Sequence, residues 1–348
     1  MRISQTIPII QKAIESQLEF RISNGGRDAQ RLIPYLQGKA GLGKTTSIIS
    51  VCEANDNWSY FILSLAQFDA GELMGVIAMD GDNAKRLKPH WLVHVEQLAS
   101  DSDVVVLFCD ELAQAPVANM NVARQLINEL RCGDFMLPDN VVIVAAGNRV
   151  SDRAGANNIP THMKDCLMFL DVEADLDDAV GYLSSKGISP VITGFMRFRP
   201  ELLNKVDRDA DANPSPRSYE RLDTVLSWGL PEPVEKEAVA GILGRGVCAE
   251  FYGYKPIFDS AITVDEVLAN PTSAPVPEEP AVCYAVTSAL AHAMTDKNVG
   301  AITQYLARFV HKEFYVLAMK DAFKRTPSLK QTPEFRAFLL EHGAELML

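Results

Sequence analysis

The segment from Gly38 to Thr45 reads G-K-A-G-L-G-K-T, a pattern whose residue types and spacing suit the binding of a polyphosphate. It follows an apolar run at residues 32–36 and precedes a helix-compatible stretch at residues 46–53, so a strand, a turn and a helix are expected in that order. Successive backbone N–H groups in a glycine-rich turn can wrap the phosphates of a nucleoside triphosphate, and a helix N-terminus adds positive partial charge. We therefore interpret this segment as a phosphate-binding loop.

The residues of the loop have distinct expected parts in that chemistry. The glycines permit the backbone to approach the phosphates closely, Lys44 reaches the outer phosphates, and the Thr45 hydroxyl can contact Mg²⁺. The predicted nucleotide-binding residues of this segment are Gly38, Lys39, Ala40, Gly41, Leu42, Gly43, Lys44, Thr45 and Thr46.

A pair of carboxylates follows a second apolar run, Val104 to Phe108, which is typical of a strand buried on both faces. Such strands belong to parallel sheets covered by helices, and ligands collect at their carboxyl ends. Asp110 and Glu111 would then lie beside the phosphate-binding loop. We expect Asp110 to hold Mg²⁺ through water and Glu111 to polarise a water that attacks the terminal phosphate.

Two further polar residues fit the same site. Residues 141–146 form a third apolar strand that ends just before Asn148, whose amide can hydrogen-bond both the water and the terminal phosphate. Ser215-Pro216-Arg217-Ser218 opens a helical segment, and Arg217 in its first turn suits a side chain that reaches towards nucleotide. Taken singly, an ordinary turn residue and a solvated arginine are equally good interpretations, but the order of the motifs favours the functional one.

Together these motifs resemble those of the AAA+ ATPases, and more narrowly those of the MoxR-type branch. The narrower resemblance is carried by residues 68–75 (F-D-A-G-E-L-M-G), 146–156 (A-G-N-R-V-S-D-R-A-G-A) and 195–203 (F-M-R-F-R-P-E-L-L), and it extends over about residues 10–325. It implies ATP as the nucleotide, hydrolysis with Mg²⁺, and a homo-oligomeric ring, as a rule a hexamer, with nucleotide sites between subunits. It also implies that the ring remodels or activates a protein client, often one with a von Willebrand factor A domain.

The chain departs from the family pattern just before the fifth predicted strand. The family usually has an arginine there that reaches the neighbouring subunit's site, whereas this chain has Cys166. A thiol offers neither the permanent charge nor the bidentate geometry of a guanidinium. Three alternatives stay open: Arg153 supplies the catalytic charge, which we favour, Lys164 does so less well, or hydrolysis is intrinsically slow.

Composition fits a soluble protein, because 47% of the 348 residues are hydrophobic and 22% are charged. No apolar run approaches the roughly 18 residues of a membrane span, and the N-terminal residues lack the basic region of a signal peptide. We expect a cytoplasmic protein without a membrane partner, whose six scattered cysteines stay reduced. A net charge of −12 argues against nucleic acid as the main partner.

One basic cluster, Lys85 to Lys88, lies within residues 76–90, which we expect to project from the core as a small hairpin or loop insertion. In the resembled branch such an insertion faces the pore or a partner. The cluster leaves open a second function, that of a nucleic-acid-linked ATPase such as a helicase loader or an initiator-like protein. A nucleotide-dependent scaffold with slow hydrolysis is a third possibility.

The expected fold class is α/β, with a P-loop AAA+ core built on a doubly wound parallel sheet and followed by helical regions. The predicted parts are an N-terminal helical segment (residues 1–30), the α/β core (31–172), a helical lid (173–269), a proline-rich connector (270–280) and a C-terminal helical region (281–348). Near the C-terminus an apolar stripe is expected to pack internally rather than against a partner. The stripe comprises Ile302, Tyr305, Leu306, Phe309 and Val310.

Overall fold

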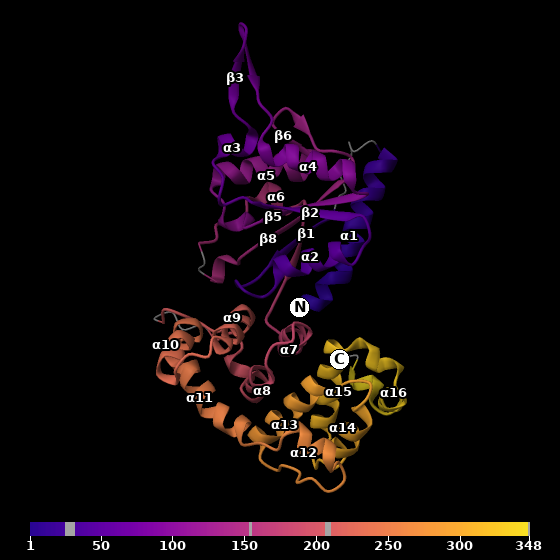
Figure 1. Cartoon of the computed structure of the whole chain (residues 1–348). Coiled ribbons are helices and arrows are strands. Elements are labelled where there is room, and N and C mark those ends of the chain that lie inside the picture. The colour runs from indigo at the N-terminus through magenta and orange to yellow at the C-terminus, as the bar shows by residue number, and fades with distance from the viewer. Residues whose placement is uncertain (25–31, 153–154, 206–209, 347–348) are drawn as a thin grey trace. The chain divides into compact units, whose positions relative to one another are not determined.

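The computed structural model describes residues 1–24, 32–152, 155–205 and 210–346 of the chain. It divides into two compact units, residues 1–173 and residues 174–348. Figure 1 labels the elements of both units. The elements of the first unit are α1 (Ile3–Asn24), β1 (Ile33–Gln37), α2 (Lys44–Glu53), β2 (Trp58–Ser64), α3 (Ala70–Met74), β3 (Ile77–Asp80), β4 (Asn83–Arg86), α4 (His90–Asp101), β5 (Val104–Asp110), η1 (Leu112–Gln114), α5 (Val117–Glu129), β6 (Arg131–Cys132), β7 (Phe135–Met136), β8 (Val141–Gly147), η2 (Val150–Asp152), α6 (Thr161–Lys164) and β9 (Leu167–Asp171).

A five-stranded sheet in the order β2-β5-β8-β1-β9 forms the centre of the first unit. Every neighbouring pair in it is parallel. Helices α1 and α2 lie on one side of this sheet, and α4 and α5 lie on the other (Figure 1). The doubly wound parallel sheet predicted from the sequence is therefore confirmed.

Alternation along the central strands explains why both faces of the sheet are covered. In β5, Val105, Leu107 and Cys109 belong to the core cluster that includes side chains of α4 and α5. Successive strand residues point to opposite faces, so Val106 and Phe108, which are also fully buried, face the side of α1 and α2. A strand that is apolar on both faces needs helices on both, which is the condition for a buried parallel sheet.

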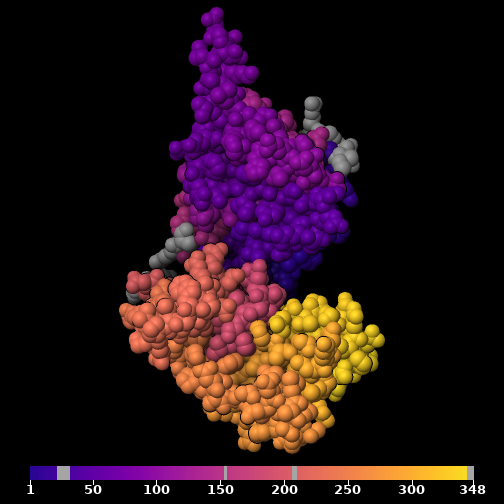
Figure 2. All heavy atoms as spheres, in the orientation of Figure 1, coloured from indigo at the N-terminus to yellow at the C-terminus, as the bar shows by residue number. Residues whose placement is uncertain are grey.

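Two small antiparallel hairpins stand outside the central sheet. The hairpin β3–β4 pairs Ile77 with Arg86 and projects from the first unit (Figures 1 and 2), which confirms the predicted insertion. Its base is fastened, because the Arg86 guanidinium donates to the carbonyl of Gly75 over 2.9 Å. The second hairpin, β6–β7, was not expected from the sequence, and Asp134 in its turn lies 3.9 Å from the Arg86 guanidinium.

The second unit is helical throughout its described ranges. None of the helices in the described parts of the chain is long and apolar enough to span a membrane. The elements of this unit are α7 (Leu176–Ser185), α8 (Pro190–Phe198), η3 (Pro200–Leu202), α9 (Pro216–Ser227), α10 (Glu232–Leu243), α11 (Arg245–Asp259), α12 (Val264–Ala269), α13 (Pro280–Ala293), α14 (Val299–Leu306), α15 (Glu313–Arg325), η4 (Pro327–Gln331) and α16 (Pro333–Leu346).

Helix α13 joins two apolar clusters of the second unit. Ala281 and Ala285 belong to the cluster built around α7–α11, whereas Cys283 and Val286 belong to the cluster built around α14–α16. Helix α13 therefore packs both on helices before residue 280 and on helices after it. The predicted apolar stripe is buried as far as Phe309, but α14 ends at Leu306, and Val310 is 79% exposed outside the helix.

A cluster of charged side chains ties α7, α8 and α15 together inside the second unit. The buried Arg197 guanidinium contacts Asp321 at 2.7 Å and Asp177 at 2.5 Å. Lys320 contacts the other carboxylate oxygen of Asp177, also at 2.5 Å. Each charge of this helical ion cluster (Asp177, Arg197, Lys320, Asp321) thus has a partner of opposite sign. Such a saturated arrangement is typical of a structural network.

Candidate functional site

The phosphate-binding loop joins β1 to α2, the strand–turn–helix order that its sequence predicts. Gly41 and Gly43 have φ angles of 79° and 89°, in the left-handed region that glycine adopts without a steric penalty. Gly43 is the N-cap of α2, so the loop leads directly into the helix N-terminus. Backbone N–H groups at such an end have no partner within the helix and suit an anion.

Lys44 is the first residue of α2, and its side chain folds back over the loop. Its ammonium donates to the carbonyl oxygens of Gly38 at 2.6 Å and Lys39 at 2.8 Å. It also donates to Oδ1 of Asn148 over 3.3 Å. These three contacts orient the ammonium over the loop.

Thr45, in the first turn of α2, contacts Asp110 at the end of β5. The Thr45 hydroxyl donates to Oδ2 of Asp110 over 3.1 Å, and Oδ1 of Asp110 accepts from the backbone N–H of Glu111 over 2.9 Å. A hydroxyl beside a carboxylate is a donor set that suits Mg²⁺, which takes one or two protein ligands and completes its shell with water and phosphate oxygens. Among the described residues, no group of three or more His, Cys, Asp or Glu is arranged to hold a metal. The two-residue set fits a magnesium ion shared with a polyphosphate.

The strand order explains why Asn148 reaches Lys44. Strand β8 lies between β5 and β1 in the sheet, so the residues that follow β8 fall between Asp110 and the phosphate-binding loop. The backbone N–H of Asn148 donates to the side-chain oxygen of Gln114 over 3.3 Å. Gln114 thus supports Asn148 from the turn after β5, a role that the sequence analysis missed, since its only signal is a position three residues after Glu111.

Glu111 has an unusual backbone for its residue type. Its φ of 57° and ψ of 31° lie in the left-handed region, which L-residues other than glycine seldom adopt. Its carbonyl accepts from the N–H groups of Gln114 and Ala115, both over 3.0 Å, and these bonds hold the turn. Within the described chain its half-buried carboxylate makes no hydrogen bond or ion pair. Such an outlier at a strand end is a candidate for a group held ready for chemistry.

We call Lys44, Thr45, Asp110, Glu111 and Asn148 the strand-end cluster. Side-chain hydrogen bonds join Lys44 to Asn148 and Thr45 to Asp110, and the backbone N–H of Glu111 donates to Asp110. The neighbouring Cys109 is not a nucleophile for this site, because burial raises the pKa of its thiol to about 12, with a further contribution from Asp110.

The other predicted site residues lie in the second unit, in segments away from the strand ends named above, or outside the described residues. Arg217 is an exposed residue in the first turn of α9, in the second unit. Arg153, the favoured catalytic arginine, lies outside the described residues. Cys166 is half-buried between α6 and β9, and Lys164 is an exposed residue at the end of α6.

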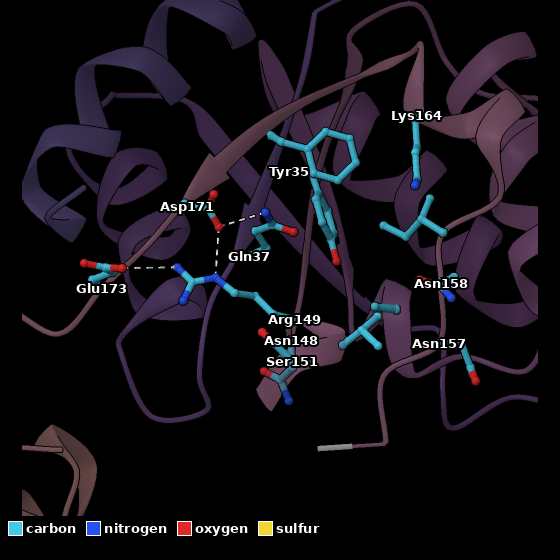
Figure 3. A pocket seen from close by; sticks show the side chains of 14 residues that line it. Tyr35, Gln37, Asn148, Arg149, Ser151, Asn157, Asn158, Lys164, Asp171 and Glu173 are labelled. Atoms are coloured by element: carbon cyan, nitrogen blue, oxygen red, sulfur yellow. Dashed lines mark hydrogen bonds and ion pairs between the residues drawn. The ribbon is translucent and has the colours of Figure 1, made fainter. Parts of the chain in front are cut away.

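A polar cavity of about 460 Å³ adjoins Asn148 on the side of β9. Figure 3 shows it from close by, with Tyr35, Lys164 and Arg149 among its lining residues. The Arg149 guanidinium donates to Asp171 over 2.9 Å and to the carbonyl of Val172 over 3.0 Å. The sequence analysis missed this contact, because nothing in the local pattern of either segment indicates its partner.

Comparisons with known proteins add little to the interpretation of this site, which therefore depends on its geometry. No protein-family model matches the chain, and no curated protein sequence matches it. A crystal structure of a candidate ATPase from Cytophaga hutchinsonii ATCC 33406 is 13% identical in sequence, and the match covers 97% of this chain and 91% of that chain. The TM-score of 0.34 is too low for this likeness to support an argument about fold or activity.

Proposed function

We propose that this chain is a nucleoside triphosphatase of the AAA+ type that binds ATP with Mg²⁺ and hydrolyses it to ADP and phosphate. The observation that carries the proposal is the strand-end cluster. The ends of β1, β8 and β5 bring Lys44 to Asn148 over 3.3 Å and Thr45 to Asp110 over 3.1 Å, beside a glycine loop that opens a helix. Cation, metal-binding pair and polar amide are the parts that phosphoryl transfer to water needs in one place.

Each residue then has a definite role in the proposed reaction. Lys44 holds the outer phosphates and offsets negative charge that develops on them. Thr45 and Asp110 hold Mg²⁺, which when bound neutralises charge on the phosphate oxygens. Glu111 accepts a proton from the attacking water, and Asn148 fixes the direction of that water. The backbone N–H groups of Glu111 and Asn148 donate to the side chains of Asp110 and Gln114, and these two contacts position both residues without engaging their own side chains.

We also propose that the chain assembles into a homo-oligomeric ring, most simply a hexamer. This part of the proposal rests on the resemblance of the motifs. A non-hydrolysable ATP analogue should drive the chain into a defined oligomer at micromolar concentration, as measured by light scattering. A monomer with and without the analogue would contradict the ring.

Action on a protein client is supported by the surface of the β3–β4 hairpin, where Ile77 and Met79 are 60% and 75% exposed. An apolar projection of this kind is typical of a protein-binding segment. The alternative partner, nucleic acid, has weaker support, because Arg86 is bound to the Gly75 carbonyl and Lys88 is paired with Glu96 at 2.6 Å. Of that basic cluster, Lys85 is the exposed cation at the hairpin. A client with a von Willebrand factor A domain is one candidate partner.

Two substitutions test the proposed activity. Lys44→Ala should abolish tight nucleotide binding, because it removes the cation from the loop. Glu111→Gln should retain nucleotide binding and lose turnover on the order of 10²–10⁴-fold, because the amide cannot accept the proton. Fluorescent-nucleotide titration and phosphate release measure the two effects. Normal binding and near wild-type turnover in both variants would overturn the proposal.

A further inference from the structure

The segment that leaves the sheet towards the second unit is held by residues adjacent to the strand-end cluster. It comprises Asp171, Val172 and Glu173, after which the second compact unit begins. Figure 3 shows Gln37 and Arg149 both directed at Asp171. Gln37 is the last residue before the phosphate-binding loop, and Arg149 directly follows Asn148. The ends of β1 and β8, two of the three strands that carry the site, therefore each send a side chain to the same short segment.

The contacts converge on a single carboxylate oxygen. Oδ1 of Asp171 accepts from the Gln37 amide over 2.8 Å and from the Arg149 guanidinium over 2.9 Å. Arg149 also donates to the carbonyl of Val172 over 3.0 Å, and its guanidinium lies 4.0 Å from the carboxylate of Glu173. The backbone N–H of Val172 in turn donates to the carbonyl of Gln37 over 2.8 Å.

These contacts contribute more to the orientation of the segment than to the stability of the fold. The side chain of Asp171 is 61% exposed, and an ion pair so open to water contributes little to folding. The side chain of Arg149 is only 23% exposed and spans three consecutive residues of the segment. A planar guanidinium with several donors fixes the direction of such a segment better than a single ammonium does.

We infer that Arg149 is a positioning residue that couples the nucleotide site to the segment entering the second unit, an inference that rests on the proposed function. We call its contacts, made by Gln37, Arg149 and residues 171–173, the Arg149 clasp. Nucleotide bound to Lys44 and Asn148 shifts the ends of β1 and β8, and the clasp passes that shift to residues 171–173. The coupling needs a segment with two arrangements whose balance the ligand biases.

Hydrogen–deuterium exchange of the whole chain, with and without a non-hydrolysable ATP analogue and Mg²⁺, tests this inference. In the wild type the analogue should slow exchange in residues 38–50 and change exchange in residues 171–178 by at least about threefold. Arg149→Met should keep the first response and lose the second. Its turnover should fall by about tenfold with KM changed by less than about twofold, because ground-state binding is preserved.

Three further variants complete the test. Asp171→Asn removes the shared charge from the opposite side of the clasp and should reproduce Arg149→Met, so the test does not depend on the folding of one variant. Arg149→Lys should restore part of the response. Arg131→Met removes an exposed ion pair with Glu129 and is the matched control, with both responses intact.

The outcomes distinguish failure of the proposed function from failure of the proposed coupling. A wild type whose residues 38–50 do not respond to the analogue contradicts the proposed function, and the coupling with it. A response in residues 38–50 without one in residues 171–178, or a full response at 171–178 in Arg149→Met, overturns the coupling alone.

Discussion

Two charged clusters of this chain differ in the partners that hold their charges. In the strand-end cluster, the Asp110 carboxylate is held by neutral groups, the Thr45 hydroxyl and the backbone N–H of Glu111. In the helical ion cluster, Arg197 and Asp177 are held by groups of opposite charge. Neutral partners orient a charged group without neutralising it, whereas a partner of opposite charge neutralises it within the folded structure. The first arrangement suits binding and the second suits architecture.

The position of each cluster reinforces this difference. The strand-end cluster lies where parallel strands end, beside a glycine-rich loop, and its Glu111 has a backbone conformation rarely adopted by such a residue. The helical ion cluster lies between helices, where the side chain of Arg197 is 5% exposed and that of Asp321 is 7% exposed. Substitutions in the two clusters should therefore change different measured quantities.

After Glu111→Gln, the largest effect on turnover in the strand-end cluster is expected for Asn148→Ala. Loss of the amide that orients the attacking water should lower turnover by about 10²-fold, with nucleotide affinity changed by less than about threefold. Phosphate release and fluorescent-nucleotide titration measure the two quantities. Gln114→Ala, which removes only the support of the Asn148 backbone, should lower turnover by about tenfold. Near wild-type turnover in Asn148→Ala would contradict the assignment of the strand-end cluster to catalysis.

Gly147→Ala tests how closely the end of β8 packs against its neighbours. A Cβ atom at this position would lie 2.4 Å from the Tyr35 hydroxyl and 3.1 Å from the backbone nitrogen of Ala113. We expect a loss of about 2–3 kcal/mol in the free energy of unfolding of the first unit. The double variant Tyr35→Phe/Gly147→Ala should recover part of it, because the nearest clashing atom is gone. Urea unfolding of both variants measures the difference, and equal loss in the two would contradict the packing explanation.

Asp177→Asn should change stability and leave basal turnover intact, the reverse of Asn148→Ala. Loss of the carboxylate charge leaves Arg197 and Lys320 with weaker partners, at a cost of about 2 kcal/mol. The unfolding midpoint of the second unit should fall by roughly 5 °C. Differential scanning calorimetry measures the midpoint, and a turnover defect without a stability defect would reverse the assignment of the two clusters.

The same variant makes a pH-dependent prediction. Burial alone would raise the pKa of Asp177, but hydrogen bonds and charge from Lys320 and Arg197 outweigh it and hold that pKa well below its usual range. The stabilisation is therefore complete above the unfolded-state pKa of about 3.9 and is lost as the pH falls below it. The difference in midpoint between wild type and Asp177→Asn should shrink below about pH 4, and a constant difference would contradict the ionic account.

The smallest effect on turnover is expected at the hairpin. Lys85→Glu reverses the exposed cation on the hairpin, whereas Arg86 holds the hairpin base through the Gly75 carbonyl and Lys88 pairs with Glu96. Lys85→Glu should leave basal ATP turnover within about twofold and change only partner-stimulated turnover. A matching loss of DNA-stimulated turnover would instead favour the nucleic-acid-linked alternative. Collapse of basal turnover would place the hairpin in the catalytic core.

The sequence predicted most of the central sheet and the composition of the strand-end cluster. Uninterrupted apolar runs such as residues 104–108 indicate buried parallel strands. Because parallel strands end at the same edge of a sheet, Asp110 and Asn148 are expected at that edge. These inferences need only local pattern and one rule of topology. The geometry of Lys44 against Asn148 follows from the strand order, which local patterns do not determine.

What the sequence did not reveal depends on contacts between distant residues. Gln114 supports Asn148, and Arg149 reaches Asp171, through bonds that no periodicity or motif predicts. The short β6–β7 hairpin escaped for the same reason, since strands of two residues carry no readable alternation. Val310 was assigned to an apolar stripe by spacing alone, but α14 ends before it, at Leu306.

The most direct test of the account is calorimetric titration of ATP into Glu111→Gln, whose lack of turnover allows binding to be measured at equilibrium. The strand-end cluster predicts one site per chain, with affinity at least about tenfold weaker when EDTA removes Mg²⁺. The same titration with Lys44→Ala/Glu111→Gln should show no tight binding. Absence of binding in Glu111→Gln, or equal affinity in the two variants, would contradict the claim that these strand ends form a nucleotide site.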